Sequence, residues 1–254
     1  MHNFKLVNNI LQISKDAGEE ILSIYKSGAF EIESKNDSSP LTKADKVSNE
    51  IICESLKKLN PDIPIISEEN CDVTFSERVN WERYWLIDPL DGTKEFIKKN
   101  GEFTVNIALI ENGKATMGII FAPVCNQYFW GDEKLGSYSS TDLKEFKKIS
   151  ISKRESKIKI LCSRSHPSNE LEEFLSTYDD YEIIKKGSSL KFCLIANGTA
   201  DIYPRFGPTS EWDIAAGSAV LRYAGGSIKT LQGEELLFNK KDSYINEYFI
   251  ASNL

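Results

Sequence analysis

Residues 85–97 read Trp-Leu-Ile-Asp-Pro-Leu-Asp-Gly-Thr-Lys-Glu-Phe-Ile, and the rest of the chain can be interpreted outward from them. The apolar run over residues 84–87 predicts a buried strand that ends at Asp88 and Pro89, because proline cannot donate a ladder hydrogen bond. The chain then turns, so Asp88 and Asp91 are expected to leave the same strand end and to converge on one point.

Two carboxylates held this close repel each other unless a cation lies between them, so Asp88 and Asp91 indicate a metal site. Gly92 permits close approach of the backbone, and Thr93 opens a predicted helical turn whose free amides face the carboxylates. The stretch therefore predicts a metal site beside an anion site. The alternative is a plain surface turn, since Asp, Pro and Gly are common turn residues.

The composition is that of an ordinary globular protein of 254 residues, long enough for one large domain or two lobes. A net charge of -7 disfavours nucleic acid as a partner, because such binding needs a basic surface. Residues 1–20 hold no continuous apolar core and no later run reaches membrane-spanning length. We therefore expect no signal peptide and no integral membrane segment.

The histidine and cysteine content limits the kind of metal site and indicates the redox environment. The chain has only two histidines, which disfavours a His-rich zinc or iron site, whereas carboxylates suit Mg2+ or Mn2+. The five cysteines are scattered and never form a Cys-x-x-Cys pair, as in a reducing cytoplasm.

The first part of the chain predicts two long helices and an antiparallel sheet. Apolar periodicity indicates helices from Asn3 to about Lys26 and from Ala44 to a point before Pro61. The expected strands are 63–66, 84–87, 103–110, 115–122 and 127–130. The polar segment 70–83 is interpreted as a mobile loop over a site.

Two acids of this part have ordinary explanations as well as functional ones. Asp45 falls in the first turn of the second helix, where it can form a capping box with Thr42. Glu68 follows a short strand and can be a solvated turn residue, although Asp88 also lies at a strand end.

Residues 140–157 are charged and lack apolar runs, which marks a boundary between lobes. We expect residues 1–150 to form an α+β lobe with most metal ligands and residues 151–254 to form an α/β lobe. Strands are expected at 158–163, 181–185, 200–203, 227–230 and 248–251, and helices at 168–178, 188–196 and 213–224. This alternation predicts a largely parallel sheet flanked by helices.

Three loops of the second part follow strands and precede helices, the usual place for ligands in such sheets. They are residues 163–167, 187–191 and 205–213. Each can also be a plain helix cap, Asp213 above all. Arg205 is harder to explain that way, because its planar fork in a proline-flanked loop suits phosphate.

Five acids lie at strand ends and helix starts, namely Asp45, Glu68, Asp88, Asp91 and Asp213. If the fold brings them together, it must do so around two or more Mg2+ ions, which would polarise a phosphate and lower the pKa of a water. No Cys-His or Ser-His pair is offered as a nucleophile, so direct attack by water is the simplest route.

The motifs that carry these acids resemble those of a known family. Ser-Glu-Glu at 67–69, Asp-Pro-Leu-Asp-Gly-Thr at 88–93 and Trp-Asp-x-Ala-Ala-Gly at 212–217 resemble the signature of the lithium-sensitive, magnesium-dependent inositol monophosphatase superfamily. Blocks at 85–97, 101–110, 163–166, 187–194 and 203–209 are similar to its bisphosphate nucleotidases. The resemblance implies a layered αβαβα sandwich that removes the 3'-phosphate of 3'-phosphoadenosine 5'-phosphate in cytoplasmic sulfur assimilation.

The resemblance also implies roles for individual residues. Glu68, Asp88 and the Leu90 carbonyl would hold one Mg2+, and Asp88, Asp91 and Asp213 a second, with two or three ions per site. Thr93, hydrogen-bonded to Asp45, would orient the attacking water together with Glu68. The implied substrate contacts are Asp91, Gly92, Thr93, Ser163, Arg164, His166, Ser188, Lys191, Arg205 and Asp213.

Two alternatives stay open. An inositol or sugar phosphatase would use the same metal centre, but Lys191 and Arg205 imply a second anion and favour a bisphosphate. A non-enzymatic sensor of Mg2+ and phosphate would not need Thr93 and Asp45, which serve water activation. A homodimer and a peripheral place at the inner membrane are further expectations from the resemblance.

Overall fold

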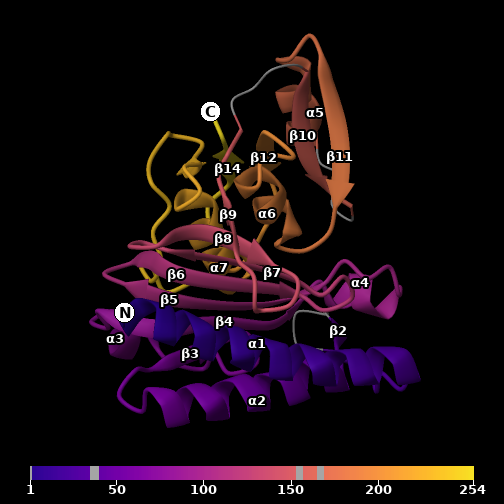
Figure 1. Cartoon of the computed structure of the whole chain (residues 1–254). Coiled ribbons are helices and arrows are strands. Elements are labelled where there is room, and N and C mark those ends of the chain that lie inside the picture. The colour runs from indigo at the N-terminus through magenta and orange to yellow at the C-terminus, as the bar shows by residue number, and fades with distance from the viewer. Residues whose placement is uncertain (1, 35–39, 153–156, 165–168) are drawn as a thin grey trace.

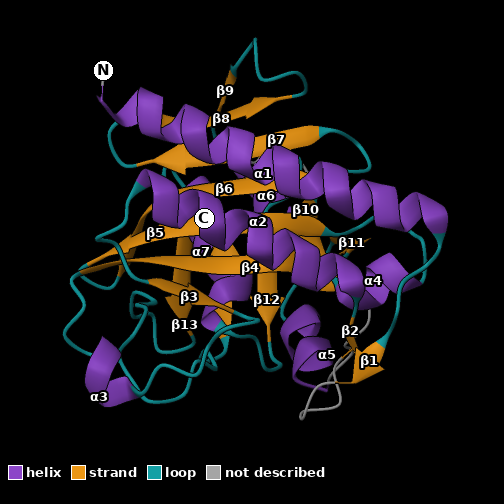
Figure 2. Ribbon diagram, turned by 90° about the horizontal axis from the view of Figure 1, so that it is seen from below, coloured by secondary structure: helices purple, strands orange, loops and turns teal. Residues whose placement is uncertain are grey.

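The computed structural model describes residues 2–34, 40–152, 157–164 and 169–254, and these residues stack in five layers (Figure 1). Helices α1 (His2–Ser27) and α2 (Lys43–Leu59) cover the outer face of a seven-stranded sheet, as Figure 2 shows from below. Helices α6 (Leu190–Ala196) and α7 (Glu211–Arg222) separate it from a five-stranded sheet, and α5 (Asn169–Ser176) lies outermost. The expected αβαβα sandwich is confirmed.

The seven-stranded sheet runs in chain order from β3 to β9, and every pairing is antiparallel except that of β3 with β4. Its strands are β3 (Ile65–Ser67), β4 (Arg83–Asp91), β5 (Thr104–Glu111), β6 (Lys114–Ala122), β7 (Gln127–Asp132), β8 (Gly136–Ser140) and β9 (Lys147–Ile149). The sequence analysis missed β8 and β9, because their short polar segments carry little hydrophobic signal.

Strand β4 is apolar throughout because both of its faces are buried. Trp85 and Ile87 face the core under α1 and α2, whereas Tyr84 and Leu86 face the core shared with α7. A strand covered on both sides needs a continuous apolar run rather than an alternating one.

The expected end of β4 at Asp88 and Pro89 is wrong, because the strand continues to Asp91. The pairing with β5 becomes irregular between Asp88 and Asp91, so Pro89 lies where no ladder donor is required. The Ser48 hydroxyl of α2 donates to the Pro89 carbonyl over 2.8 Å. The two aspartates therefore flank a bulge in one strand instead of a turn after it.

The five-stranded sheet has the order β11-β10-β12-β14-β13. Its strands are β10 (Ile158–Ser163), β11 (Tyr181–Lys186), β12 (Ile202–Arg205), β13 (Ser227–Thr230) and β14 (Phe249–Ser252). The expectation of a largely parallel sheet is wrong: β10 pairs in parallel with β11 and β12, but β14 is antiparallel to both of its neighbours. The segment between β13 and β14 contains no crossover helix, so β14 returns in the opposite direction.

Helix α7 lies across the first sheet at unusually close range. A methyl group on Gly131 of β7 would lie 2.6 Å from the Ala219 carbonyl oxygen, and Gly118 of β6 leaves as little room beside Ala216. The helix therefore passes from β7 over β6 toward β4, which brings Asp213 at its first turn to the end of β4. The predicted lobe boundary at residue 150 stays a prediction.

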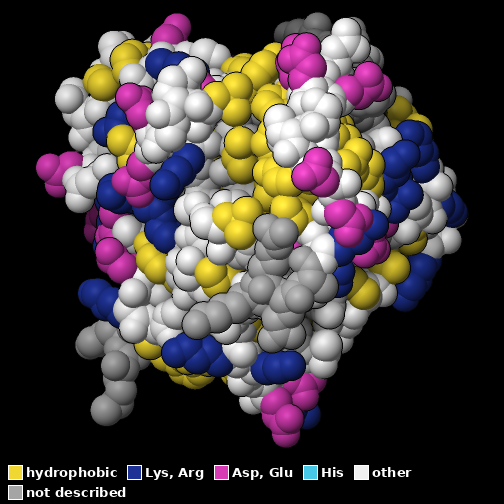
Figure 3. Space-filling model, turned by 90° about the horizontal axis from the view of Figure 1, so that it is seen from above, with side chains coloured by type: hydrophobic (Ala, Val, Ile, Leu, Met, Phe, Trp, Pro, Cys, Tyr) yellow, Lys and Arg dark blue, Asp and Glu magenta, His cyan; other side chains and the backbone are white. Residues whose placement is uncertain are grey.

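Two features of the chain concern membrane contact and surface charge. No helix in the described part of the chain is long and apolar enough to cross a bilayer. On the face seen from above, hydrophobic side chains gather in the upper middle, and Lys, Arg, Asp and Glu side chains lie around them (Figure 3).

Gly131→Ala tests the close approach of α7. Overpacking a core contact costs about 1–3 kcal/mol, so the melting temperature should fall by several degrees. The measurement is thermal unfolding followed by circular dichroism, with exposed Lys229→Ala as the control. An unchanged melting temperature for Gly131→Ala would mean that the helix does not sit this close to the sheet.

Candidate metal and phosphate site

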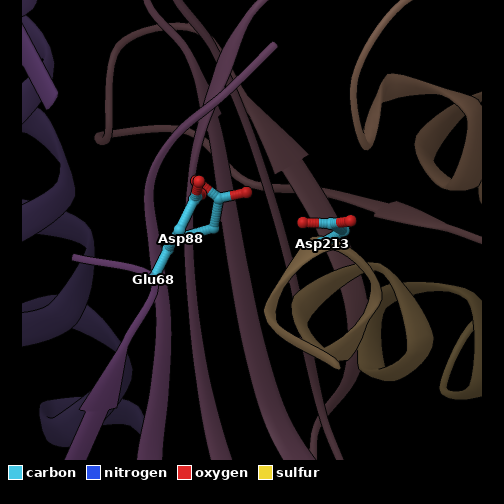
Figure 4. Close-up of side chains that lie close together, drawn as sticks. All are labelled: Glu68, Asp88 and Asp213. Atoms are coloured by element: carbon cyan, nitrogen blue, oxygen red, sulfur yellow. The ribbon is translucent and has the colours of Figure 1, made fainter. Parts of the chain in front are cut away.

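Three acids from distant parts of the chain meet at one end of the first sheet. Glu68 follows β3, Asp88 lies in β4 and Asp213 lies in the first turn of α7; each offers a carboxylate oxygen within 4.8 Å of the others. Figure 4 shows the Glu68 and Asp88 carboxylates side by side, with Asp213 facing them from its helix. Asp213 also accepts a hydrogen bond from the Ser210 amide over 2.8 Å, so it caps the helix as well.

The electrostatics of this cluster favour a bound cation. Burial raises the pKa of Asp88 well above its ordinary value, and repulsion from Glu68, Asp91 and Asp213 raises it further. Burial likewise raises the pKa of Asp213, with Asp91 and Glu68 adding to the effect. An all-oxygen set of crowded carboxylates fits Mg2+ or Mn2+, whose charge removes the repulsion.

Asp91 lies beside this group and is tied to the second sheet. Its Oδ2 accepts hydrogen bonds from the Ser188 hydroxyl at 2.7 Å, from the Ser189 amide at 2.5 Å and from Asn106 Nδ2 at 3.4 Å. All three bonds end on Oδ2. No described residue bonds to Oδ1, so that oxygen can bind a cation. Ser188 holds this position with a φ of 57°, which is uncommon for a non-glycine residue.

Thr93 and Asp45 form the predicted pair. The Thr93 hydroxyl lies 3.1 Å from Asp45 Oδ1 and 3.3 Å from the Leu90 carbonyl oxygen, to which it can donate in turn. Asp45 Oδ2 accepts from the hydroxyl and the amide of Thr42 at 2.5 and 2.7 Å. One oxygen of Asp45 therefore caps α2 and the other reaches Thr93, so its capping role does not exclude a functional one.

The backbone beside Thr93 forms a tight corner. Gly92 has a φ of 95°, and a side chain there would also lie 3.0 Å from the Glu102 carbonyl oxygen. Only glycine satisfies both constraints. The short helix α4 (Thr93–Ile97) starts at this corner.

A cleft of about 370 Å³ joins the acids to the loops of the second sheet. Twelve of the fourteen predicted site residues line it: Glu68, Asp88, Leu90, Asp91, Gly92, Thr93, Ser163, Arg164, Ser188, Lys191, Arg205 and Asp213. Asp45 lies behind Thr93 and is not part of the lining. His166 falls outside the described residues.

Lys191 and Arg205 are the two buried cations of the cleft. Lys191 Nζ donates to the Ser188 carbonyl at 2.7 Å and lies 4.9 Å from the centre of the Tyr203 ring. Arg205 donates from Nη2 to the Pro208 carbonyl at 2.8 Å, and its buried Nε has no hydrogen-bond partner. Neither forms an ion pair within the described part of the chain, so both can receive an anion.

The sequence analysis missed a polar network behind Asp91. Thr104 and Asn106 of β5 are buried, and the Ser189 hydroxyl bonds to both, at 2.7 and 2.8 Å. Glu102, Thr104 and Asn106 alternate with apolar residues, and this period of two places polar side chains on one face of a strand. This alternation was the signal from which the sequence analysis could have found the network.

One other expectation fails at α3 (Phe75–Arg78). The segment 70–83 is not a loop over the site: Arg78 is 1 % exposed, bonds to Asn239 and stacks on Tyr244, away from the cleft. Glu211 also faces this network and accepts from the Asn239 amide at 2.9 Å. It is therefore not among the residues that line the cleft.

The comparison with known families accounts for this arrangement. Residues 5–253 match the model of the inositol monophosphatase family. The chain belongs to the inositol monophosphatase family. The match covers both sheets and every predicted site residue, so family membership extends to the whole cleft.

Relatives within the family share more than the fold. The chain is 42 % identical to the 3'(2'),5'-bisphosphate nucleotidase CysQ of Salmonella typhimurium over 96 % of its own length and 98 % of the relative's. It is 45 % identical to the CysQ of Buchnera aphidicola, over 98 % and 94 %. The crystal structure of CysQ from Bacteroides thetaiotaomicron matches with a TM-score of 0.86 and 36 % identity, over 97 % and 96 % of the two chains.

Asp213→Asn tests the charge balance of the cluster. Removing one of several repelling carboxylates should raise the melting temperature of the protein in EDTA, whereas the rise that Mg2+ gives the unaltered chain should be largely lost. The measurement is thermal unfolding with and without Mg2+, and Asp142→Asn, which changes an exposed acid, is the control. Equal stabilisation of Asp213→Asn and the unaltered chain by Mg2+ would remove Asp213 from the metal site.

Proposed function

We propose that the protein is a Mg2+-dependent phosphomonoesterase that hydrolyses the 3'-phosphate of 3'-phosphoadenosine 5'-phosphate to AMP and phosphate. The observation that carries the proposal is the pairing, in one cleft, of an acidic cluster with two buried cations that have no anionic partner among the described residues. The similarity to nucleotidases over nearly the full length supports it.

The donor set fits two Mg2+ ions. Glu68, Asp88 and the Leu90 carbonyl would hold one ion. Asp88, Asp91 and Asp213 would hold the other. The family resemblance also allows a third ion. Bound Mg2+ would neutralise the phosphate oxygens and lower the pKa of a water. The chain's own part is to hold the carboxylates close together, although burial raises the pKa of Asp88 and Asp213.

Thr93 is suited to orient the attacking water. When its hydroxyl proton points to Asp45 Oδ1, the hydroxyl oxygen is left as an acceptor at the cleft surface. The bonds from Thr42 hold Asp45 in place, so the acceptor direction is set before substrate binds. Glu68 would be the second acceptor, which together with Thr93 would aim the water at the phosphorus.

The start of α4 and the second sheet would hold the rest of the substrate. The amides of Gly92 and Thr93 would contact the scissile phosphate, and Lys191 and Arg205 would bind the second phosphate. Ser163, Arg164, Ser188 and His166 complete the proposed contacts.

The proposal extends to the setting of the reaction. We place it in the cytoplasm, in sulfur assimilation, with inhibition by Li+. A homodimer and a peripheral place at the inner membrane stay predictions.

The proposed activity is tested by phosphate release from 3'-phosphoadenosine 5'-phosphate, inositol 1-phosphate and fructose 1,6-bisphosphate, with and without Mg2+ and Li+. We expect the adenosine bisphosphate to have the highest kcat/KM, with activity lost in EDTA and reduced by Li+. A higher kcat/KM for either other substrate would favour the inositol or sugar phosphatase. Binding of Mg2+ and bisphosphate without any phosphate release would favour the sensor.

Thr93→Val removes the hydroxyl and keeps the shape of the side chain. Because the hydroxyl acts on the water and not on the bound phosphate, kcat should fall about 100-fold or more while KM changes little. Thr93→Ser, which retains the hydroxyl, is the control and should keep most of the rate. A rise in KM with unchanged kcat would assign Thr93 to substrate binding instead.

Lys191→Met tests the second anion site. Burial lowers the pKa of Lys191 to about 8, although Asp91, Glu102 and Asp213 oppose the shift while Arg205 adds to it. The lysine is therefore charged below pH 8, and KM for the bisphosphate should rise as the pH increases from 7 to 9.

In Lys191→Met, KM for the bisphosphate should be about tenfold higher and should lose this pH dependence, since one charged hydrogen bond is worth about 1.5 kcal/mol. KM for 3'-AMP, which has a single phosphate, should change little, and exposed Lys148→Met is the control. Equal losses on both substrates would contradict a second-phosphate site.

A further inference from the structure

Glu102, between α4 and β5, is a junction between the two sheets. Its carboxylate accepts hydrogen bonds from Arg164 Nε at 3.0 Å, Arg164 Nη2 at 2.8 Å, Lys186 Nζ at 3.2 Å and the Gly187 amide at 2.8 Å. Its side chain is only 13 % exposed. Although burial alone would raise its pKa, the hydrogen bonds from Arg164, Gly187 and Lys186 lower it, so the carboxylate stays charged.

The first consequence concerns the loop that starts at Gly187. The next two residues, Ser188 and Ser189, donate the two shortest hydrogen bonds to Asp91. A methyl group on Gly187 would lie 3.1 Å from both the Cβ and the carbonyl oxygen of Glu102, so the loop is packed directly on this residue. Glu102 therefore holds the donors that orient Asp91.

The second consequence concerns Arg164. Arg164 donates from Nε and Nη2 to the Glu102 carboxylate, and Nη2 also donates to the Lys185 carbonyl at 3.2 Å. No bond from Nη1 to a described residue is present. Because the guanidinium is planar, fixing one edge fixes the direction of the remaining donors at the cleft wall.

We propose that Glu102 is a positioning residue that sets both the metal ligand Asp91 and the anion-binding edge of Arg164. The proposal rests on the proposed function for its substrate but not for its metal-binding part. A carboxylate behind the Arg164 wall of the cleft would by itself weaken anion binding, so its four hydrogen bonds must offset that repulsion. It acts through other residues and contacts neither the water nor the phosphate.

Substitution can separate the effect of Glu102 on Asp91 from its effect on Arg164. In Glu102→Ala both effects should be lost. The dissociation constant for Mn2+, measured by calorimetry, and KM for 3'-phosphoadenosine 5'-phosphate should each rise about fivefold or more. At saturating Mg2+ kcat should stay within about twofold. Arg164→Ala should raise KM and leave Mn2+ binding unchanged, since it removes the contact to the anion and does not disturb Asp91.

Glu235 offers a matched control, because it also pairs with two cations, Lys114 and Arg222, at a distance from the cleft. Glu235→Ala should alter neither constant. Glu102→Gln keeps an acceptor for the Gly187 amide and replaces Glu102→Ala if that variant does not fold; we expect the same direction with a smaller change.

Mn2+ binding and KM within twofold of the unaltered protein in both Glu102 variants would overturn the proposal. A fall in kcat alone would also overturn it, since that would place Glu102 in the chemical step. If the unaltered protein releases no phosphate but Glu102→Ala still weakens Mn2+ binding, the proposed function fails and the positioning of Asp91 stands.

Discussion

The mutual repulsion of carboxylates enclosed in one small space is the constraint on which the rest of the site depends. Glu68, Asp88 and Asp213 come from three separate segments, and Asp91 adds a further charge beside them. Hydrophobic packing of both sheets against α7 provides the free energy that holds these charges together. The acids stay together because they belong to packed helices and strands, and bound divalent cations would relieve their repulsion.

Three of the acids, Asp45, Asp91 and Asp213, are each held by an ordinary structural contact through one carboxylate oxygen. Asp45 and Asp213 cap helices, and Asp91 binds a loop of the second sheet through a single oxygen. Capping uses one carboxylate oxygen and leaves the other available. An acid can therefore cap a helix and also belong to the site, so the sequence analysis did not need to choose between these two explanations.

The cleft joins two different electrostatic environments. The edge of the first sheet and the start of α7 supply the acids, whereas α6 supplies Lys191 and β12 supplies Arg205. An anionic substrate would therefore lie between cations on both sides once metal is bound. Glu102 lies where the two sheets meet: it precedes β5 of the first sheet and pairs with Arg164 and Lys186 at the ends of β10 and β11. The relative placement of the two sheets thus determines whether both halves of a substrate can be held at once.

The sequence by itself determined most element positions, because hydrophobic periodicity and turn residues act over short distances. Its acidic motifs carried the family resemblance, and that resemblance implied the layered fold. It was least reliable where the tertiary context overrides local signals. Examples are the bulge that carries β4 through Pro89, the polar strands β8 and β9, and the antiparallel return of β14.

Only the tertiary structure decided which polar residues belong to the cleft. Glu211 and Asp213 are two residues apart in one helix, yet one bonds to Asn239 and the other faces Asp88. The alternation of Glu102 with Thr104 and Asn106 could place its side chain on their face but could not name its partners, which lie more than 60 positions away along the chain. Contacts between distant segments depend on how sheets and helices pack, and a local pattern carries no record of that packing.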